Sequence, residues 1–398
     1  MKLFFALSQL LAFSQAAFAL ESATRPFSAP DSAAQSEVVA TTLSNGAFFV
    51  GWVDSIKTSS DCRFSVSRDH AHWTPILKHA SPGYELGTNP ALAADENGEL
   101  YVVCLSARGD YSKGALEFAR SSDHGNTWSP WKKIITEIGG VPDKPAIEAK
   151  GKNLRVVYTD LRPQKSDGMA GLISEIMSFD SGSTWSQPRR LSSGQAHDPA
   201  NFRVRGEQGA SIAQTMGQDF LSFGDYGGGS ITWKARADHG RILKSTSTVA
   251  TSDVNTPITQ TLTRDGKNIT ILWYDAHVFG NVFVASSFDA GKTWESRKQL
   301  SASGSLAVAA FDSSDVLHVM WTDSTPDHRK LVHAHSGDQG RNFSTPQLIQ
   351  TWADAPDFIQ GAYQGLTPAA SGVEAFWIKS ENGAGKIYQT HIATPVSP

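Results

Sequence analysis

The sequence predicts an all-β protein: a seven-bladed β-propeller of four-stranded antiparallel blades. Three observations support this prediction. One short turn sequence recurs at intervals of roughly 50 residues, which indicates one supersecondary unit repeated along the chain. Short apolar segments alternate with turn sequences, and the chain supplies the turns with 34 glycines and 18 prolines. An array of four-stranded units is stable as a closed ring, because closure protects strand edges that would otherwise pair with other chains.

The recurring turn is clearest at residues 178–185, which read SFDSGSTW. A short Asp or Ser side chain accepts hydrogen bonds from nearby backbone N–H groups and holds such a turn closed. Glycine supplies a positive φ, and the tryptophan gives a large apolar surface that packs against a neighbouring unit. The other copies are 121–128 and 287–294, a looser one at 336–343, and two eroded ones at 67–73 and 236–240.

The pattern S-x-D-x-G-x-T-W resembles the Asp-box, or BNR repeat, of the sialidase superfamily. The resemblance covers nearly all of the chain, as a repeat and not as an active site. It implies that each box joins the third and fourth strands of a blade, on the face away from the ligand funnel, so the box residues are structural. Family sialidases usually have six blades, and their arginine triad and Arg-Ile-Pro landmark are not found here. The nearest match to that landmark is Arg25-Pro26-Phe27, so no catalytic residue is assigned.

The apolar segments divide into seven units. The seventh, at 367–370, 373–378 and 387–392, lacks a fourth strand, and we expect residues near 24–28 to supply it and close the ring. The expected first strands of the seven units begin near residues 38, 90, 145, 211, 257, 306 and 367.

The first nineteen residues read as a secretory signal peptide. Lys2 precedes an apolar segment, and Ala17-Phe18-Ala19 provides small residues for cleavage near Ala19. No other segment is long and apolar enough to span a membrane. We therefore expect one exported domain, residues 20–398, in a secreted or periplasmic location. Only Cys62 and Cys104 are present, and the sequence leaves open whether they form a disulfide bond or remain two buried thiols.

Composition and motifs argue against a nucleic-acid partner, a cofactor and a metal ion. The formal net charge is −4, whereas a nucleic-acid partner would favour a basic stripe. The chain has no phosphate-binding loop, zinc-binding cysteine set or G-x-S-x-G motif, so we expect no cofactor and no metal. His333 and His335 lie on one face of a strand at a spacing compatible with a metal, but no third ligand is evident and a solvated strand is the favoured interpretation. We also expect a monomer.

The face opposite the boxes is the expected ligand-binding face, because loops on a rigid scaffold there surround a funnel. Five second strands end alike in an aspartate. These carboxylates either bind sugar hydroxyls or a metal ion, or act as a general acid–base pair, or each one holds its own strand-end turn, which the repetition favours. They are Asp54, Asp160, Asp225, Asp275 and Asp323.

Other polar residues on the same loops break the repeat and are therefore further candidates for ligand binding. Arginine offers a planar fork for the carboxylate of an acidic sugar, and Tyr or His beside a carboxylate suits nucleophilic or acid–base roles. These candidates are Arg108, Arg162, His197, Arg203, Tyr226 and Tyr274.

The sequence thus supports two classes of function. The first is an exported propeller that binds or cleaves carbohydrate, with acidic sugars expected, as a glycoside hydrolase or as a polysaccharide lyase. The second is a non-catalytic scaffold that binds a glycan or a protein. The fold alone does not decide between them.

Overall fold

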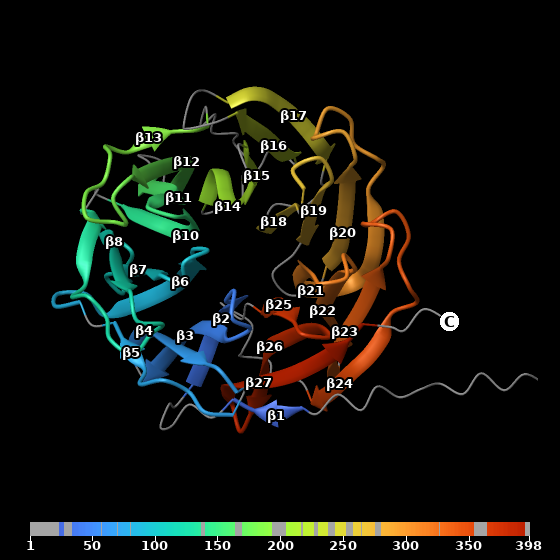
Figure 1. Ribbon diagram of the computed structural model, residues 1–398, viewed down its shortest axis with the longest axis horizontal. Coiled ribbons are helices and arrows are strands. Elements are labelled where there is room, and N and C mark those ends of the chain that lie inside the picture. Colours follow the sequence, from blue (N-terminus) through green and yellow to red (C-terminus); the bar gives the residue numbers. More distant parts are fainter. Residues whose placement is uncertain are drawn as a thin grey trace, which may run out of the picture.

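A computed structural model describes residues 24–27, 34–56, 58–69, 71–79, 81–136, 140–163, 169–192, 204–215, 218–226, 230–237, 243–251, 258–263, 265–274, 280–325, 327–353 and 364–394. Every regular element in this part of the chain is a β-strand, which confirms the all-β prediction. Strands are grouped in sheets around a central axis, and the fold is propeller-like (Figure 1). Among these residues, no helix offers the length and apolar character needed to cross a membrane.

The strands follow one another as antiparallel meanders. The first group is β1 (Arg25–Pro26), β2 (Ala34–Thr42), β3 (Phe48–Ile56), β4 (Ser59–Ser67), β5 (Leu77–Lys78), β6 (Leu86–Ala94), β7 (Leu100–Ala107), β8 (Gly114–Ser121), β9 (Lys132–Ile135), β10 (Val141–Lys150), β11 (Asn153–Pro163), β12 (Met169–Ser178) and β13 (Arg189–Arg190).

The second group is β14 (Val204–Thr215), β15 (Gln218–Tyr226), β16 (Ser230–Ala237), β17 (Leu243–Thr251), β18 (Ile258–Thr263), β19 (Ile269–Tyr274), β20 (Gly280–Ser287), β21 (Lys298–Phe311), β22 (Leu317–Ser324), β23 (His328–Ser336), β24 (Gln347–Ala353), β25 (Gly365–Ala369), β26 (Gly372–Glu381) and β27 (Ala384–Ala393).

Neighbouring meanders are joined at their edges. The sheet β2-β3-β4 continues into β6-β7-β8-β9 through a parallel contact between Ser60 and Leu86. A second parallel contact joins β12 to β14, and β21 is long enough to pair with both β20 and β22. Figure 1 shows β2, β6, β10, β14, β18 and β25 nearest the centre of the ring.

The two ends of the described chain meet in one sheet, in the order β1-β27-β26-β25. Arg25 is paired with Gln389, and the N–H of Phe27 donates to the carbonyl of Ile387 at 2.9 Å. The Phe27 ring then packs edge-on against Trp52 of β3, with ring centres 5.1 Å apart. The N-terminal segment therefore supplies the outer strand of the last meander, as expected from the incomplete final repeat.

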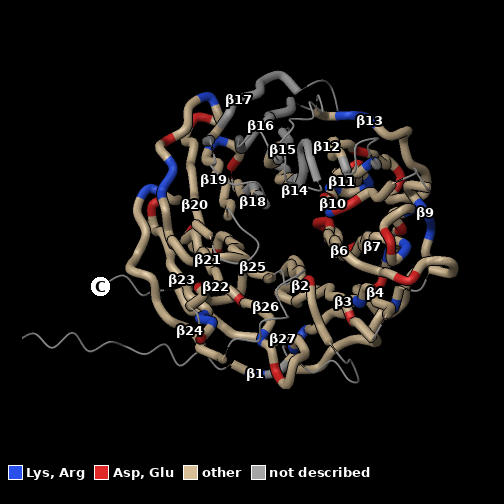
Figure 2. The backbone as a smooth tube through the Cα atoms, turned by 180° about the vertical axis from the view of Figure 1, so that it is seen from behind, with Lys and Arg blue, Asp and Glu red and all other residues tan. Residues whose placement is uncertain are grey.

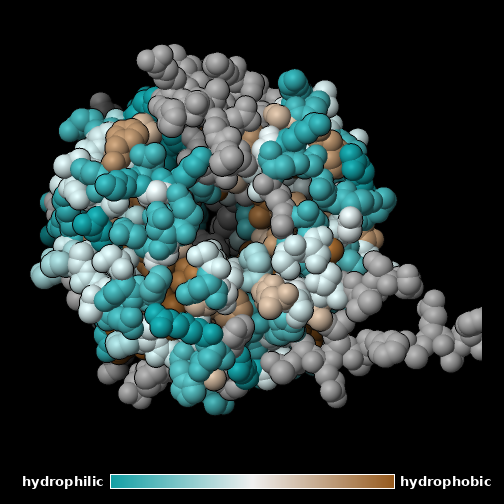
Figure 3. Space-filling model, viewed as in Figure 1, coloured by the Kyte–Doolittle hydropathy of each residue, from teal (hydrophilic) through white to brown (hydrophobic). Residues whose placement is uncertain are grey.

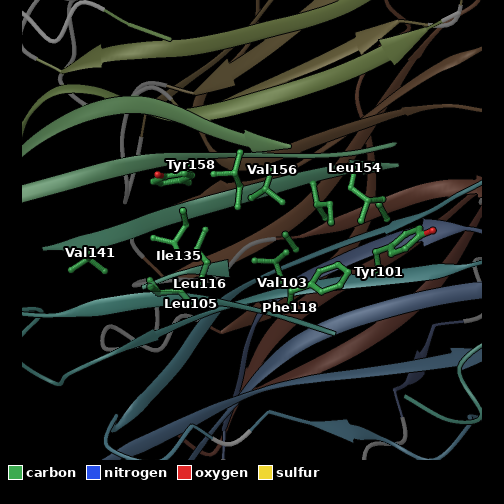
Figure 4. Packing of buried hydrophobic residues seen from close by; sticks show 14 of the residues in the cluster. Tyr101, Val103, Leu105, Leu116, Phe118, Ile135, Val141, Leu154, Val156 and Tyr158 are labelled. Atoms are coloured by element: carbon green, nitrogen blue, oxygen red, sulfur yellow. The ribbon is translucent and has the colours of Figure 1, made fainter. Parts of the chain in front are cut away.

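The core lies between the faces of successive sheets. Figure 4 shows Val103 and Phe118, from β7 and β8, facing Leu154 and Val156 of β11. These side chains are almost fully buried. Alternation along each strand sends neighbouring residues to opposite faces, so each sheet contributes to two such layers.

The recurring turn is closed by its own side chains. In the copy at 178–185, Asp180 accepts from the backbone N–H of Thr184 at 2.8 Å and from its hydroxyl at 2.6 Å. Ser178 donates to the same carboxylate at 2.8 Å and accepts from the N–H of Gly182 at 2.8 Å. These hydrogen bonds to the charged form lower the pKa of Asp180 to about 2. The same set of contacts recurs around Asp123 and Asp289.

The glycine of this turn is required for close packing as well as for its backbone conformation. Gly182 has φ 84°, and a Cβ placed there would lie 2.4 Å from the ring of Phe118 in the preceding meander. The ring centre of Trp185 lies 5.3 Å from that of Phe118. The turn is therefore a joint between neighbouring sheets.

A disulfide bond joins Cys62 of β4 to Cys104 of β7, with Cα atoms 6.2 Å apart. The sequence left this pairing open. Both residues are fully buried, in a cluster with Phe64 and Val102. The bond therefore links two neighbouring meanders through their shared core.

Candidate ligand-binding site

Two of the strand-end aspartates are held within their own sheets. The indole N–H of Trp52 donates to Asp54 at 3.0 Å, and the Arg63 guanidinium lies 3.0 Å from the other carboxylate oxygen. Trp52 and Asp54 are both buried. Residues two apart on a strand point to the same side, so the pattern Trp-x-Asp creates this pair locally.

Asp323 repeats the arrangement at the end of β22. It accepts from the indole N–H of Trp321 at 2.8 Å and from the hydroxyl of Ser301 at 2.5 Å. For both aspartates the contacts are those that a strand-end structural role requires.

Asp160 and Arg162 form a different kind of pair at the end of β11. The guanidinium Nε and Nη2 each lie 2.9 Å from one oxygen of the carboxylate, in a two-pronged contact. The Asp160 side chain is 10% exposed, whereas that of Arg162 is 53% exposed. The hydrogen bonds from Arg162 raise its own pKa further, so this cation is fixed in place and presented to solvent.

The end of β11 that carries Arg162 lies far from the recurring turns. Lys152, just before β11, accepts a backbone hydrogen bond from Ser181 of the turn at 2.9 Å. Ten residues of extended strand separate Lys152 from Arg162, which is about 30 Å along the strand. Arg162 therefore lies on the face opposite the turns, where the ligand-binding face was predicted.

Arg108 opens the hairpin between β7 and β8, and it is exposed. Its carbonyl accepts from the N–H of Tyr111 at 2.9 Å, and the Tyr111 side chain is 47% exposed. The N–H of Gly109 donates to Glu85 at 3.0 Å, which ties the hairpin to the segment entering β6. This hairpin carries a cation and an aromatic ring three residues apart in the sequence.

The remaining predicted residues are distributed as follows. Tyr274 ends β19 and is buried in an apolar cluster with Leu272 and Val282. Asp225 and Tyr226 are the last residues of β15 and are paired through their backbones with Glu207 and Gly206. His197, Arg203 and Asp275 lie outside the described residues.

The inner strands carry a set of bulges that the sequence did not predict. The register shifts between Ser36 and Val39 in β2, between Thr88 and Ala91 in β6, and between Asp143 and Ala146 in β10. Each shift contains a non-glycine residue in the left-handed region, and such bulges and such strain are concentrated at functional sites. These residues are Glu37 (φ 52°), Asn89 (φ 50°) and Lys144 (φ 47°).

The bulges carry a connected group, which we call the inner polar cluster: Glu37, Thr88, Asn89, Asp143 and Lys144. Glu37 accepts from the Thr88 hydroxyl at 2.7 Å and from the N–H of Asn89 at 2.5 Å. The Asn89 side chain donates to Asp143 at 3.0 Å. Burial raises the pKa of Glu37. Figure 3 shows the face hollowed at its centre, and the strands that carry the cluster surround this axis.

The prolines that follow Asn89 and Lys144 do not signal these bulges. Proline favours an extended backbone in the residue before it, whereas both residues lie in the left-handed region. The local sequence pattern therefore gives no signal for the bulges.

A row of charged side chains, of which Arg155 and Glu175 are buried, crosses the third meander. Arg155 Nε lies 3.4 Å from one oxygen of Glu175, and Arg189 Nε donates to the other at 2.7 Å. Glu148, opposite Arg155 in the register, has its pKa raised to about 8 by burial. The Glu175 carboxylate is therefore held between two guanidinium groups within the sheet.

Three histidines meet between β22 and β23, and His333 is buried, so the interpretation of His333 and His335 as part of a solvated strand is wrong. His318 and His333 lie with Nδ1 and Nε2 2.9 Å apart, and the other nitrogen of His318 is 3.2 Å from Asp312. The ring centres of His333 and His335 are 6.1 Å apart. Over the described part of the chain, no group of three or more His, Cys, Asp or Glu side chains is arranged to hold a metal ion.

The histidine cluster is expected to make stability depend on acid. Burial lowers the pKa of His333 to about 3, whereas the ordinary value is 6.5. The unfolded chain therefore takes up a proton first, so this contribution is complete above pH 6.5 and is lost as the pH falls toward 3. Urea unfolding measured between pH 6.5 and pH 3 should show that the free energy of unfolding falls less steeply with pH for His333→Gln than for wild type. The exposed His328→Gln serves as control, and equal slopes for wild type and His333→Gln would contradict the expectation.

No family model matches the chain, and no curated protein matches it. Solved structures do match. An ulvan lyase of a polysaccharide lyase family, bound to -[GlcA(1-4)Rha3S]-, has a TM-score of 0.62 at 9% identity, over 93% of this chain and 96% of that one. An α-L-arabinofuranosidase of Fusarium graminearum in complex with arabinobiose has 0.53 at 14% identity, over 79% and 93%. A Hadza microbial sialidase has 0.51 at 15% identity, over 90% of this chain and 66% of that sialidase. At these identities the likeness is one of fold, and the fold shared with these glycan-acting proteins is propeller-like.

Proposed function

We propose that the chain is an exported seven-bladed Asp-box propeller that binds an acidic glycan on the face opposite the recurring turns. The signal peptide would be residues 1–19, and residues 20–398 would form one domain. The repeated meanders and the return of β1 to β27 support the ring of seven. The glycan-acting proteins of similar fold support carbohydrate as the ligand.

The observation that carries the proposal is the Asp160–Arg162 pair. A guanidinium that is already oriented by a carboxylate and half exposed can bind the carboxylate of a uronic or sialic acid without much loss of side-chain freedom. The inner polar cluster adds hydroxyl, amide and carboxylate groups, which suit sugar hydroxyls.

A polysaccharide lyase is the enzyme class that we favour within this proposal. The likeness to the ulvan lyase extends over nearly the whole of both chains. In such an enzyme the Arg162 guanidinium would neutralise the uronate carboxylate of the substrate. The alternatives are a glycoside hydrolase and a non-catalytic binder.

Replacing Arg162 by alanine is expected to weaken binding of short uronate or sialic acid oligosaccharides by about ten- to one-hundred-fold, because a charge-assisted hydrogen bond is lost. The affinity of Arg162→Lys should lie between those of wild type and Arg162→Ala, since an ammonium cannot form the two-pronged contact of a guanidinium. Isothermal titration calorimetry measures both. Lys292→Ala, on an exposed recurring-turn position, is the control.

The same protein should be screened for turnover on uronate polymers, sialosides and arabinosides. Unsaturated uronate product would identify a lyase, and a reducing end without unsaturation would identify a hydrolase. Binding without product would favour the non-catalytic alternative. Equal affinity of wild type and Arg162→Ala for every acidic oligosaccharide would refute the proposed site.

A further inference from the structure

The outer strands of three successive meanders carry positive charge only. Residues 71–79, 128–136 and 185–192, which include β5, β9 and β13, contain five Lys or Arg side chains and no Asp or Glu, although the chain as a whole has a net charge of −4. We call Lys78, Lys132, Lys133 and Arg190 the rim cations. All four are exposed, and Figure 2 shows basic residues along the outer edge at β9 and β13.

The three outer strands are physically continuous. The indole N–H of Trp131, beside β9, donates to the carbonyl of Lys78 in β5 at 3.2 Å. On the other side of β9, the Lys132 ammonium donates to the carbonyl of Ser183 at 2.6 Å, in the turn that precedes β13. The rim cations therefore form one row across neighbouring sheets.

The rim cations are not paired with carboxylates in the described part of the chain. Lys132 is bound by a neutral carbonyl, and Lys133 lies 4.8 Å from the centre of the Tyr84 ring. Within the described ranges, none of the four forms an ion pair, whereas the fifth cation, Arg189, is neutralised by the buried Glu175. The equivalent position in β21 is Lys298, and there Glu295 lies 3.3 Å away. The rim cations of β5, β9 and β13 are therefore not balanced by a nearby carboxylate in the way that Lys298 of β21 is.

We propose that the rim cations bind a linear acidic polysaccharide at a second site, distinct from the face that carries Arg162. A row of point charges suits a polymer with regularly spaced carboxylates or sulfates. Screening confines the field to about 8 Å at physiological ionic strength, so the row acts independently of the net charge of the chain. The choice of polysaccharide rests on the proposed function. A lipid surface is disfavoured, because the exposed large apolar side chains of the described residues are Ile56, Tyr111, Phe179 and Leu348, none of them in these segments.

The test compares long and short acidic glycans. Lys133→Gln/Arg190→Gln is expected to bind a long uronate polymer about three- to ten-fold more weakly than wild type, because two exposed charge contacts are removed. Its affinity should also depend less on salt. Binding of short oligosaccharides should be unchanged. Lys292→Gln/Lys298→Gln removes the same charge elsewhere and should behave as wild type.

The outcomes separate this inference from the proposed function. Loss of polymer binding in the rim variant supports the rim site, even if wild type binds no short acidic oligosaccharide and the proposed function fails. Unchanged polymer affinity in the rim variant overturns the rim site while leaving the Arg162 site intact. Binding of wild type to phosphatidylserine vesicles but not to polymer, with loss in the rim variant, would overturn the polysaccharide in favour of a membrane.

Discussion

A chain with both Cys62 and Cys104 replaced by alanine should have a free energy of unfolding about 4 kcal/mol lower than wild type. The disulfide closes a loop with a sequence separation of 42, and closing such a loop removes conformational freedom mainly from the unfolded chain. The residues around it are buried, so truncation to alanine also removes contacts.

Urea unfolding of the oxidised wild type, the reduced wild type and the double variant measures this effect. Reduction should bring wild type close to the double variant, and the remaining difference is the cost of the smaller side chains. An unfolding midpoint that does not move when wild type is reduced would show that the bond contributes little.

Replacement of Asp54 by alanine should lower the free energy of unfolding by about 3 kcal/mol, because removing one partner of a buried ion pair leaves the other uncompensated. Two groups lose a partner at once: the indole N–H of Trp52 and the guanidinium of Arg63, which is left with the more distant and more exposed Asp61. Asp54→Asn keeps an acceptor and should cost less.

Asp61→Ala is the matched control, since Asp61 lies 3.8 Å from the same Arg63 but is 43% exposed. It should change stability by less than about 1 kcal/mol. Glycan binding measured on the same variants tests whether Asp54 also contacts a ligand. If Asp54→Asn keeps its stability but loses glycan affinity, Asp54 contacts the ligand and the strand-end explanation is insufficient.

What the sequence predicted well was local in the chain. The contacts of Asp180 span four residues or fewer, so the pattern S-x-D-x-G-x-T-W contains every partner. The missing fourth strand of the last repeat was predictable by counting, and β1 supplies it.

What the sequence did not predict depends on distant partners. Glu37 meets Asn89 across 52 residues, and Asn89 meets Asp143 across 54. Those pairings follow from the bulges and from how far each sheet is rotated against the next. The sequence predicts both Asp160 and Arg162 as candidates, but the repeat does not distinguish Asp160, whose partner Arg162 is half exposed, from Asp54 and Asp323, whose partners lie within their own sheets.

The return of β1 to β27 has a consequence for synthesis. A ribosome makes Arg25 long before its partner Gln389. Until β27 emerges, β1 cannot form the pairing seen in the folded sheet. A nascent chain halted before that point leaves this sheet edge incomplete, and chaperones and proteases can recognise such an edge.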